Sequence, residues 1–279
     1  MPESTKPVSF IQGLTIGSIA GMTEVMTTGH LLWAMKTRKQ QGLPRSFNPR
    51  ILYRGLWANA ASLAPITALQ IGFDQALRNR VTVSGETLSP AASYGISFAA
   101  GVGSALVSGP AEMVMTVQGL EKKKAAASVR TIVAQAGIRN GLYRGFTAAA
   151  LRDGNFTAGL LVILPALQAY FSPRIDALQL SSVPDRHQEM VRTALLHSGS
   201  GVTAGIFATV VTQSADIVKT VQQSEKLNAR NSLTGAIKQV YSSQGWKGFF
   251  SGVVSRGTRV TFAVPIMGAV SEHLKAFVR

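Results

Sequence analysis

The sequence places a few ionisable residues inside or at the ends of long apolar segments. Asp216 is followed three positions later by Lys219, whereas Glu112 is followed at the same interval by Met115. Residues three apart lie about one turn apart on one face of a helix, so the members of each pair face the same way. A charge inside a membrane-spanning helix is costly and usually has a functional role. These residues are therefore candidate ion-pairing groups.

Arginines share this unusual setting. Arg152, beside Asp153, and the pair Arg256 and Arg259 lie in or next to apolar segments. A guanidinium group presents a fork of N–H donors that matches a carboxylate or phosphate group. Three such groups in one bundle favour a small anion as ligand. The alternative is that Arg152 and Asp153 neutralise each other and bind nothing.

The residues that could catalyse a reaction or bind a metal do not show the spacing of an active site or of a metal site. The chain has no cysteine, which excludes disulfides and thiolate ligands. Its histidines are scattered, at His30, His187, His197 and His273. Neither a Ser-His-Asp constellation nor a phosphate-binding loop is present. The sequence therefore predicts no metal site and no enzyme.

Long uncharged runs are the elements that must position these groups. They span residues 56–73, 90–111, 154–172 and 198–215. Each has about the 20 residues that a helix needs to cross a bilayer. Two weaker candidates, residues 8–35 and 260–271, contain a charge or are short. The sequence thus predicts six membrane-spanning helices, rich in the small residues that allow close packing.

The overall composition agrees with a membrane protein. Of the 279 residues, 46% are hydrophobic and 15% are charged, whereas a soluble domain is usually about one-quarter charged. The net charge of +15 would suggest nucleic acid as the partner of a soluble protein, but so few charges fit that poorly. We expect no nucleic-acid partner. A soluble protein with buried helices is the less favoured alternative.

Basic residues are concentrated on one side of the predicted bundle. The connections at residues 36–54, 119–144 and 219–247 carry an excess of Lys and Arg, whereas the other connections and both termini are nearly balanced. Basic loops collect where insertion begins or where anionic lipid lies. The loops after the first, third and fifth spans should therefore share one face, with both termini on the other.

One pattern recurs three times along the chain. The odd-numbered spans end in GHLLWAMKT, GPAEMVMTVQ and QSADIVKTVQQ, and each is followed by a basic loop and then by YRG, YRG or FSG. Such self-similarity indicates tandem structural repeats. We place the repeats at residues 8–80, 88–172 and 190–279 of a single transmembrane domain, residues 1–279. The first basic loop is the shortest, which predicts a truncated helix within it.

This arrangement resembles the mitochondrial carrier family over essentially the whole chain. The odd helices of that family end in Pro-x-Asp/Glu-x-x-Lys/Arg, matched in part by Pro110 with Glu112 and by Asp216 with Lys219. QGWKGFFSG, LRDGNFTAG and SRGTR resemble further family patterns in the same order. The resemblance implies an all-α membrane fold: six transmembrane helices in three two-helix repeats around a pseudo-threefold axis, with short matrix helices after the odd helices.

The resemblance also implies a matrix gate of three pairs, in which the acid of one repeat meets the base of the next. Glu112 would pair with Lys219, and Asp216 would pair with Lys36. The third pair is apolar here and would allow a sulfur–aromatic contact. The implied gate consists of Lys36, Trp33, Glu112, Met115, Asp216 and Lys219. Counting from the glycines instead of from the Lys-Thr pair would shift the first repeat by one residue.

A cytoplasmic gate, a substrate site and lipid sites are implied in the same way. The cytoplasmic gate would use Asp74, Glu272 and Lys275, with Leu77 in the basic place of the first repeat. The substrate site would comprise Arg152, Asp153, Arg259, Arg256, Asn59 and Ser62, and the Arg-Asp pair resembles that of amino-acid-type carriers. Glycines at the starts of the even helices resemble cardiolipin sites, where backbone N–H groups meet phosphate: Gly55, Gly145 and Gly252.

Two functions fit this resemblance. In the first, the protein exchanges a small anionic carboxylate or amino-acid-like metabolite across the mitochondrial inner membrane by alternating access, with both termini toward the intermembrane space and no cofactor beyond bound cardiolipin. In the second, it is a transport-inactive structural subunit of a large inner-membrane complex. Leu31 and Ser214 stand where the family has its helix-kinking proline, which supports the second function. The charged gate and the arginines favour transport.

Overall fold

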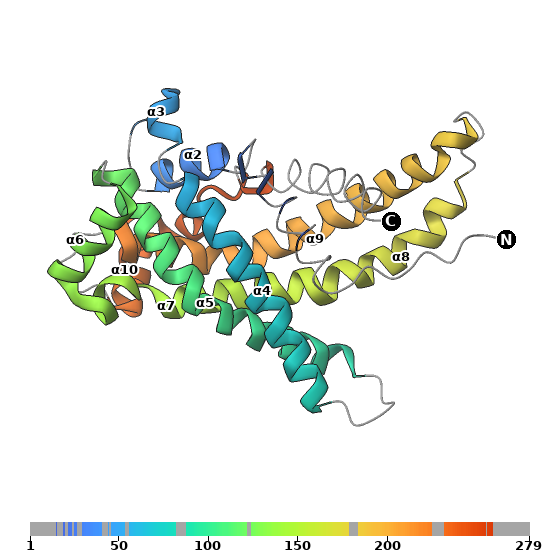
Figure 1. Ribbon diagram of the computed structural model, residues 1–279, viewed down its shortest axis with the longest axis horizontal. Helices are drawn as coiled ribbons and strands as arrows, with labels where there is room; N and C mark the ends of the chain where they lie inside the picture. Colours follow the sequence, from blue (N-terminus) through green and yellow to red (C-terminus); the bar gives the residue numbers. More distant parts are fainter. Residues whose placement is uncertain are drawn as a thin grey trace.

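The computed structural model of the protein describes residues 15, 19, 22–23, 25–26, 30–40, 44, 46–53, 56–81, 88–121, 124–178, 184–224, 232–254 and 256–258. All regular structure within these ranges is helical (Figure 1). The long and medium helices are α2 (His30–Gln40), α4 (Leu56–Val81), α5 (Pro90–Glu121), α6 (Ala125–Gly137), α7 (Phe146–Ala158), α8 (Leu164–Asp176), α9 (Asp185–Ser224) and α10 (Leu233–Gln244). Shorter pieces are α3 (Pro49–Leu52), η2 (Ile138–Leu142), η3 (Gly159–Ile163) and η4 (Gly245–Phe250). The predicted all-α fold is confirmed.

Three helices in the described ranges are long and apolar enough to cross a membrane: Pro90–Gln118, Phe146–Asp176 and His187–Gln223. They contain the predicted spans at residues 90–111, 154–172 and 198–215. The span predicted at residues 56–73 lies in α4, a continuous helix of 26 residues that Asn59 and Gln70 make less apolar. The candidate at residues 260–271, and most of the one at residues 8–35, lie outside the described residues.

The middle span contains a widened turn. α7, η3 and α8 run on without a break, and η3 is π-helical. Pro165 is the second residue of α8, after Leu164, and it has no N–H to donate. Its ring would clash with the carbonyl four residues earlier, inside η3. A π-helical turn separates these groups. We infer that it lets the helix continue past the proline.

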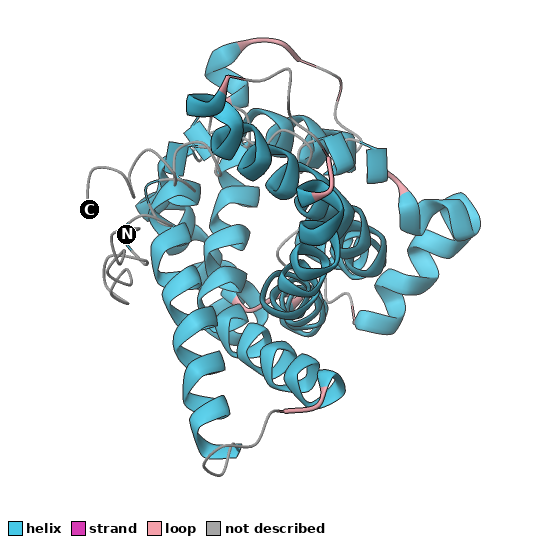
Figure 2. Ribbon diagram, turned by 90° about the vertical axis from the view of Figure 1, so that its right-hand side faces the viewer, coloured by secondary structure: helices cyan, strands magenta, loops and turns pink. Residues whose placement is uncertain are grey.

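Two helix pairs diverge from one common end of the molecule. α5 packs against α4 and α7, and α9 packs against α7 and α8. In Figure 1 the α4/α5 pair extends downward and the α8/α9 pair extends to the right, away from α6 and α10. Figure 2 also separates the two pairs at their far ends. We call the end that holds α6 and α10 the basic end, because the basic connections lie there.

The helices of the basic end differ among the three repeats. α6 and α10 have 13 and 12 residues, whereas α3 has four, as the short first loop predicted. Between the left-handed glycines that bound them, Gly137 and Gly145 or Gly245 and Gly252, the turn after α6 has seven residues (138–144) and the turn after α10 has six (246–251). This turn is π-helical after α6 and 3-10 helical after α10. A π turn holds more residues than a 3-10 turn, so the extra residue is accommodated locally.

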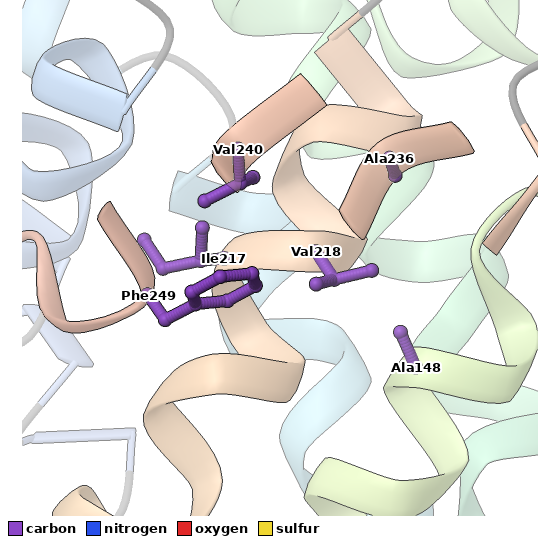
Figure 3. Close-up of a cluster of buried hydrophobic side chains, with 6 residues drawn as sticks. All are labelled: Ala148, Ile217, Val218, Ala236, Val240 and Phe249. Carbon is purple, nitrogen blue, oxygen red and sulfur yellow. The ribbon is translucent and has the colours of Figure 1, made fainter. Parts of the chain in front are cut away.

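Apolar clusters fix these short helices onto the long ones. Figure 3 shows the cluster around α9, with Ile217 and Phe249 beside each other: its members are Ala148, Ile217, Val218, Ala236, Val240 and Phe249. A second cluster joins α5 to α6 through Met113, Val114, Val117 and Ile132. Burial of such side chains contributes about 1.5–3 kcal/mol each. The clusters therefore hold the helical turns of α5 and α9 that carry the charged residues.

Candidate functional site

Ionisable side chains from three long helices meet at the basic end. Ion pairs join α5, α7 and α9 to one another and to the segment after η4. We call this group the charge cluster. It consists of Glu112, Arg152, Asp153, Asp216, Lys219 and Arg256. Three members are carboxylates and three are cations, so the charges of these six residues balance.

The predicted pair of Glu112 and Lys219 is present. Lys219 Nζ of α9 donates to Glu112 Oε2 of α5. Both side chains are largely removed from solvent, so salt and water screen their attraction little. The contact ties the second repeat to the third. Its role as a gate stays a prediction.

Arg152 of α7 lies at the centre of the charge cluster. Its Nη1 is 2.7 Å from Glu112 Oε2 and 3.4 Å from Asp216 Oδ1. Its Nε and Nη2 both contact Asp153 Oδ1, at 2.7 and 2.6 Å. The side chain is only 9% exposed, and charges attract more strongly in such a low-dielectric setting. One guanidinium group thus bridges carboxylates of α5, α7 and α9.

This position changes the relation between two predicted sets of residues. Arg152 was assigned to the substrate site and Glu112 to the matrix gate, as separate groups. The structure brings them into one ion-pair network. The reason is that α7 packs against both α5 and α9 at the level of the gate acids. The pairing of Arg152 with Asp153 is present as well, but it is not exclusive.

Asp153 has a partner that the sequence did not reveal. Ser108 Oγ of α5 donates to Asp153 Oδ2, whereas Arg152 donates to the other oxygen, Oδ1. Ser108 is buried, at 3% exposure. It sits in a run of small residues, and such residues also serve close helix packing. Nothing in its type or spacing set it apart.

The other predicted gate pairs are described only in part. Asp216 Oδ2 lies 3.8 Å from Arg256 Nη1, which places Arg256 in the charge cluster. Met115 is buried, at 3% exposure. The side chains of its predicted partner Trp33 and of Lys36 lie outside the described residues. The pairs Asp216–Lys36 and Trp33–Met115 therefore stay predictions.

Several further predicted residues also lie wholly or partly outside the described residues. For two residues of α4 the backbone is helical but the side chain is not described: Asn59 and Ser62. For four others no part is described: Gly55, Arg259, Glu272 and Lys275. Their assignments to the substrate site, the cytoplasmic gate and the lipid sites are unchanged.

Asp74, predicted for the cytoplasmic gate, has partners within its own helix pair. Arg78 Nε lies 2.7 Å from Asp74 Oδ2, and Ser97 Oγ of α5 donates to Asp74 Oδ1 at 2.5 Å. Arg78 also donates to Ser97, at 3.1 Å. The basic partner thus lies four residues after the acid, not three, where Leu77 stands. A search at the interval of four would have found it, because that spacing also aligns side chains on a helix.

Two of the predicted lipid-site glycines have a backbone conformation that favours glycine. Gly145 and Gly252 have φ angles of 75° and 82°, in the left-handed region that favours glycine. Gly145 directly precedes α7. Free N–H groups at such a helix start attract phosphate. Lipid binding itself stays a prediction.

Long apolar helix pairs, joined at one end by buried ion pairs, define a polytopic α-helical membrane protein with an internal charged site. The sequence pattern of the family described as "Mitochondrial carrier protein" matches residues 86–174 and 191–279. These two segments make up more than half of the chain. The chain therefore belongs to the mitochondrial carrier family, as the sequence motifs indicated.

Individual relatives agree with this assignment. The chain is 36% identical over 136 residues to "Mitochondrial glycine transporter B" of Danio rerio, covering 48% of this chain and 42% of that protein. It is 31% identical over 150 residues to "Mitochondrial glycine transporter" of Rattus norvegicus, covering 54% and 42%. It is 28% identical over 271 residues to "S-adenosylmethionine mitochondrial carrier protein homolog" of Drosophila melanogaster, covering 94% and 90%. The chain thus spans less than half the length of the glycine transporters it matches.

Proposed function

We propose that the protein is a metabolite carrier of the mitochondrial inner membrane that exchanges a small amino-acid-like substrate by alternating access. The observation that supports this most is the buried Arg152–Asp153 pair within the charge cluster. A guanidinium group can receive the carboxylate of a substrate, and a neighbouring carboxylate can receive its ammonium group. The two side chains together offer one partner to each end of an α-amino acid.

The charge balance favours an amino-acid-like substrate over a simple carboxylate anion. Arg152 already faces three carboxylates, from Glu112, Asp153 and Asp216. A bare anion would have to enter against all three. A substrate that carries both an ammonium group and a carboxylate can exchange partners with the Arg152–Asp153 pair and leave the total charge unchanged. Burying such a balanced set costs less than burying an extra charge.

The relatives support the same chemical class. Their names specify glycine and S-adenosylmethionine. Both molecules contain an α-amino group beside a carboxylate. We therefore assign this class, without choosing a member of it, to the substrate of the present protein.

Alternating access would use the charge cluster as the gate at the basic end. The pair Glu112–Lys219 joins the repeats there, while the far ends of the helix pairs diverge (Figure 1). Substrate would enter between the far ends and leave after the ion pairs separate. We place the basic end toward the matrix, where positive loops face anionic lipid, and both termini toward the intermembrane space. Cardiolipin would bind at Gly55, Gly145 and Gly252.

One observation supports the second function, a structural subunit without transport. α9 is an unbroken helix of 40 residues, and Ser214 stands where the family motif has its proline. Without that proline, the end of α9 has no built-in kink at which to swing. α5 does retain Pro110 at the corresponding place.

Two measurements separate the functions. The first is the native size of the protein in gently solubilised mitochondrial membranes, with mass spectrometry of the resulting bands. A free carrier migrates near its own 29.6 kDa plus detergent and lipid, whereas a structural subunit migrates in fixed ratio with a large assembly. The second is uptake of radiolabelled glycine into glycine-loaded liposomes that contain the purified protein. Uptake by the wild type and not by an Arg152→Ala variant supports the carrier. If the liposomes take up neither glycine nor any other α-amino acid, and the protein migrates in fixed ratio with a large assembly, the structural role is established.

A further inference from the structure

The contacts of Asp153 are uneven. Arg152 donates from Nε to the oxygen Oδ1 at 2.7 Å, and its Nη2 lies 2.6 Å from the same oxygen. A guanidinium group usually pairs with a carboxylate through both oxygens, in two parallel hydrogen bonds. Here the second oxygen, Oδ2, accepts from Ser108 of α5 instead. Ser108 thus keeps one carboxylate oxygen of Asp153 away from the guanidinium fork.

We propose that Ser108 is a positioning residue that keeps Asp153 available to the ammonium group of the substrate. This inference rests on the proposed function. With Ser108 in place, the Arg152–Asp153 contact stays one-sided and can be exchanged for substrate. Without the hydroxyl group, Asp153 would turn and close the stronger two-oxygen pair with Arg152. The substrate would then have to break that pair before its ammonium group could bind.

Close packing of α5 on α7 holds this contact in register. A Cβ atom added at Gly101 of α5 would lie 2.3 Å from the carbonyl oxygen of Asp153, and one at Gly154 of α7 would lie 2.7 Å from the ring of Phe98. The two backbones therefore leave room only for small residues where they meet. Ser108 lies two turns along α5 from Gly101 and faces the side chain of the same Asp153.

The same helix offers a matched control. Ser104 lies one turn before Ser108 and is equally buried. Its hydroxyl group donates to the carbonyl oxygen of Gly101, within its own helix, at 2.8 Å. Ser104→Ala therefore removes a buried hydroxyl group from α5 without changing Asp153. A graded variant is Ser108→Cys, because a thiol group is a weaker donor than a hydroxyl group.

The experiment compares glycine with glycolate, in which a hydroxyl group replaces the ammonium group. Uptake of each is measured in liposomes that contain wild type, Ser108→Ala, Ser108→Cys or Ser104→Ala. A hydrogen bond to a charged group corresponds to about a tenfold change in affinity. We expect Ser108→Ala to raise KM for glycine about tenfold, with kcat and glycolate uptake changed about twofold at most. Ser108→Cys should lie between, and Ser104→Ala should match the wild type.

Equal changes for the two substrates, or no change in KM for glycine, would overturn the inference. A thermal-unfolding cycle with Ser108→Ala, Asp153→Asn and the double variant tests the contact without transport. Shifts in Tm that fall short of additivity by about 2 °C or more support the contact, and additive shifts overturn it. If the wild type transports neither glycine nor glycolate, the proposed substrate class is wrong, and so is the proposed role of Ser108 in substrate binding. The cycle then still decides whether Ser108 positions Asp153.

Discussion

Arg152 Nη1 lies 2.7 Å from Glu112 Oε2, the same oxygen that accepts from Lys219. A substrate carboxylate that binds Arg152 must therefore compete with Glu112, the acid that holds α5 to α9. Under the proposed function, binding at the substrate site would weaken the contact that closes the basic end. A ligand can shift a conformational equilibrium only through such differential contacts. Arg152 supplies one directly.

Replacing Arg152 should affect stability as well as transport. Arg152→Gln removes the group that bridges Glu112, Asp153 and Asp216, and it leaves buried carboxylates undercompensated. We expect the free energy of unfolding to fall by about 3 kcal/mol and glycine exchange to be lost. The control is Arg174→Gln, which removes an exposed arginine of α8 that lies over the ring of Tyr170. Thermal unfolding followed by tryptophan fluorescence suits this chain, which has three tryptophans and no cysteine. Equal Tm values for the two variants would contradict the bridging role.

The pair Glu112–Lys219 should show strong coupling. Glu112→Gln and Lys219→Met each leave the partner charge buried, so each should lower stability by about 3 kcal/mol. The double variant should be clearly more stable than the sum of the single effects predicts, because neither charge is then left alone. Thermal unfolding of the four proteins gives the coupling. Additive effects would show that the two charges do not interact.

Exchanging the two charges should restore stability only in part. In the variant Glu112→Lys with Lys219→Glu, the pair itself is rebuilt in reverse. The new ammonium group at position 112, however, faces Arg152, which lies 2.7 Å from the present carboxylate. Like charges at that distance repel in a buried site. Full recovery of Tm would mean that Arg152 does not contact position 112 in the membrane.

Sequence patterns predicted those parts of the fold and site that depend on local spacing. Uninterrupted apolar length predicted three of the spans, and the resemblance of the odd helix ends to the carrier motif implied the Glu112–Lys219 contact. The position of Arg152 could not be read in this way. Its neighbour Asp153 suggested a local pair, whereas its contacts with Glu112 and Asp216 depend on how α7 crosses α5 and α9. That crossing is set by the packing of small residues, whose individual partners leave no periodic signal.

Asp74 and Arg78 should stabilise the α4/α5 pair. Arg78→Gln leaves the buried Asp74 carboxylate with Ser97 as its remaining described partner. We expect a loss of about 2 kcal/mol, partly recovered by adding Asp74→Asn, which removes the charge. Arg80→Gln, at an exposed position two residues further on, serves as control and should change Tm little. If the Arg80 variant lost as much stability as the Arg78 variant, the effect would reflect the net charge of the helix end and not this contact.

The turn after α6 and the turn after α10 each contain one glycine position at which a side chain should not be tolerated. A Cβ atom at Gly141 would lie 2.7 Å from Ile132 Cγ2 and 3.0 Å from the Ile132 carbonyl oxygen. At Gly248 the nearest atoms would be Gln244 Cβ and Val240 Cγ1, each at 2.9 Å. Backbone and Cβ atoms of a helix cannot move aside without disturbing that helix. Gly141→Ala and Gly248→Ala should therefore each cost about 1–3 kcal/mol, the usual range for overpacking.

Gly95 in α5 provides the opposite case, because a Cβ atom there would meet nothing within 4 Å. Gly95→Ala should leave stability unchanged or raise it by up to about 1 kcal/mol, since alanine favours the helix over glycine. Thermal unfolding of the three variants in one detergent makes the comparison direct. If Gly141→Ala changed Tm no more than Gly95→Ala does, Ile132 of α6 would not pack closely against the following turn. The short helices of the basic end could then not be rigid supports for the charge cluster, because α6 is joined to α5 through the same Ile132.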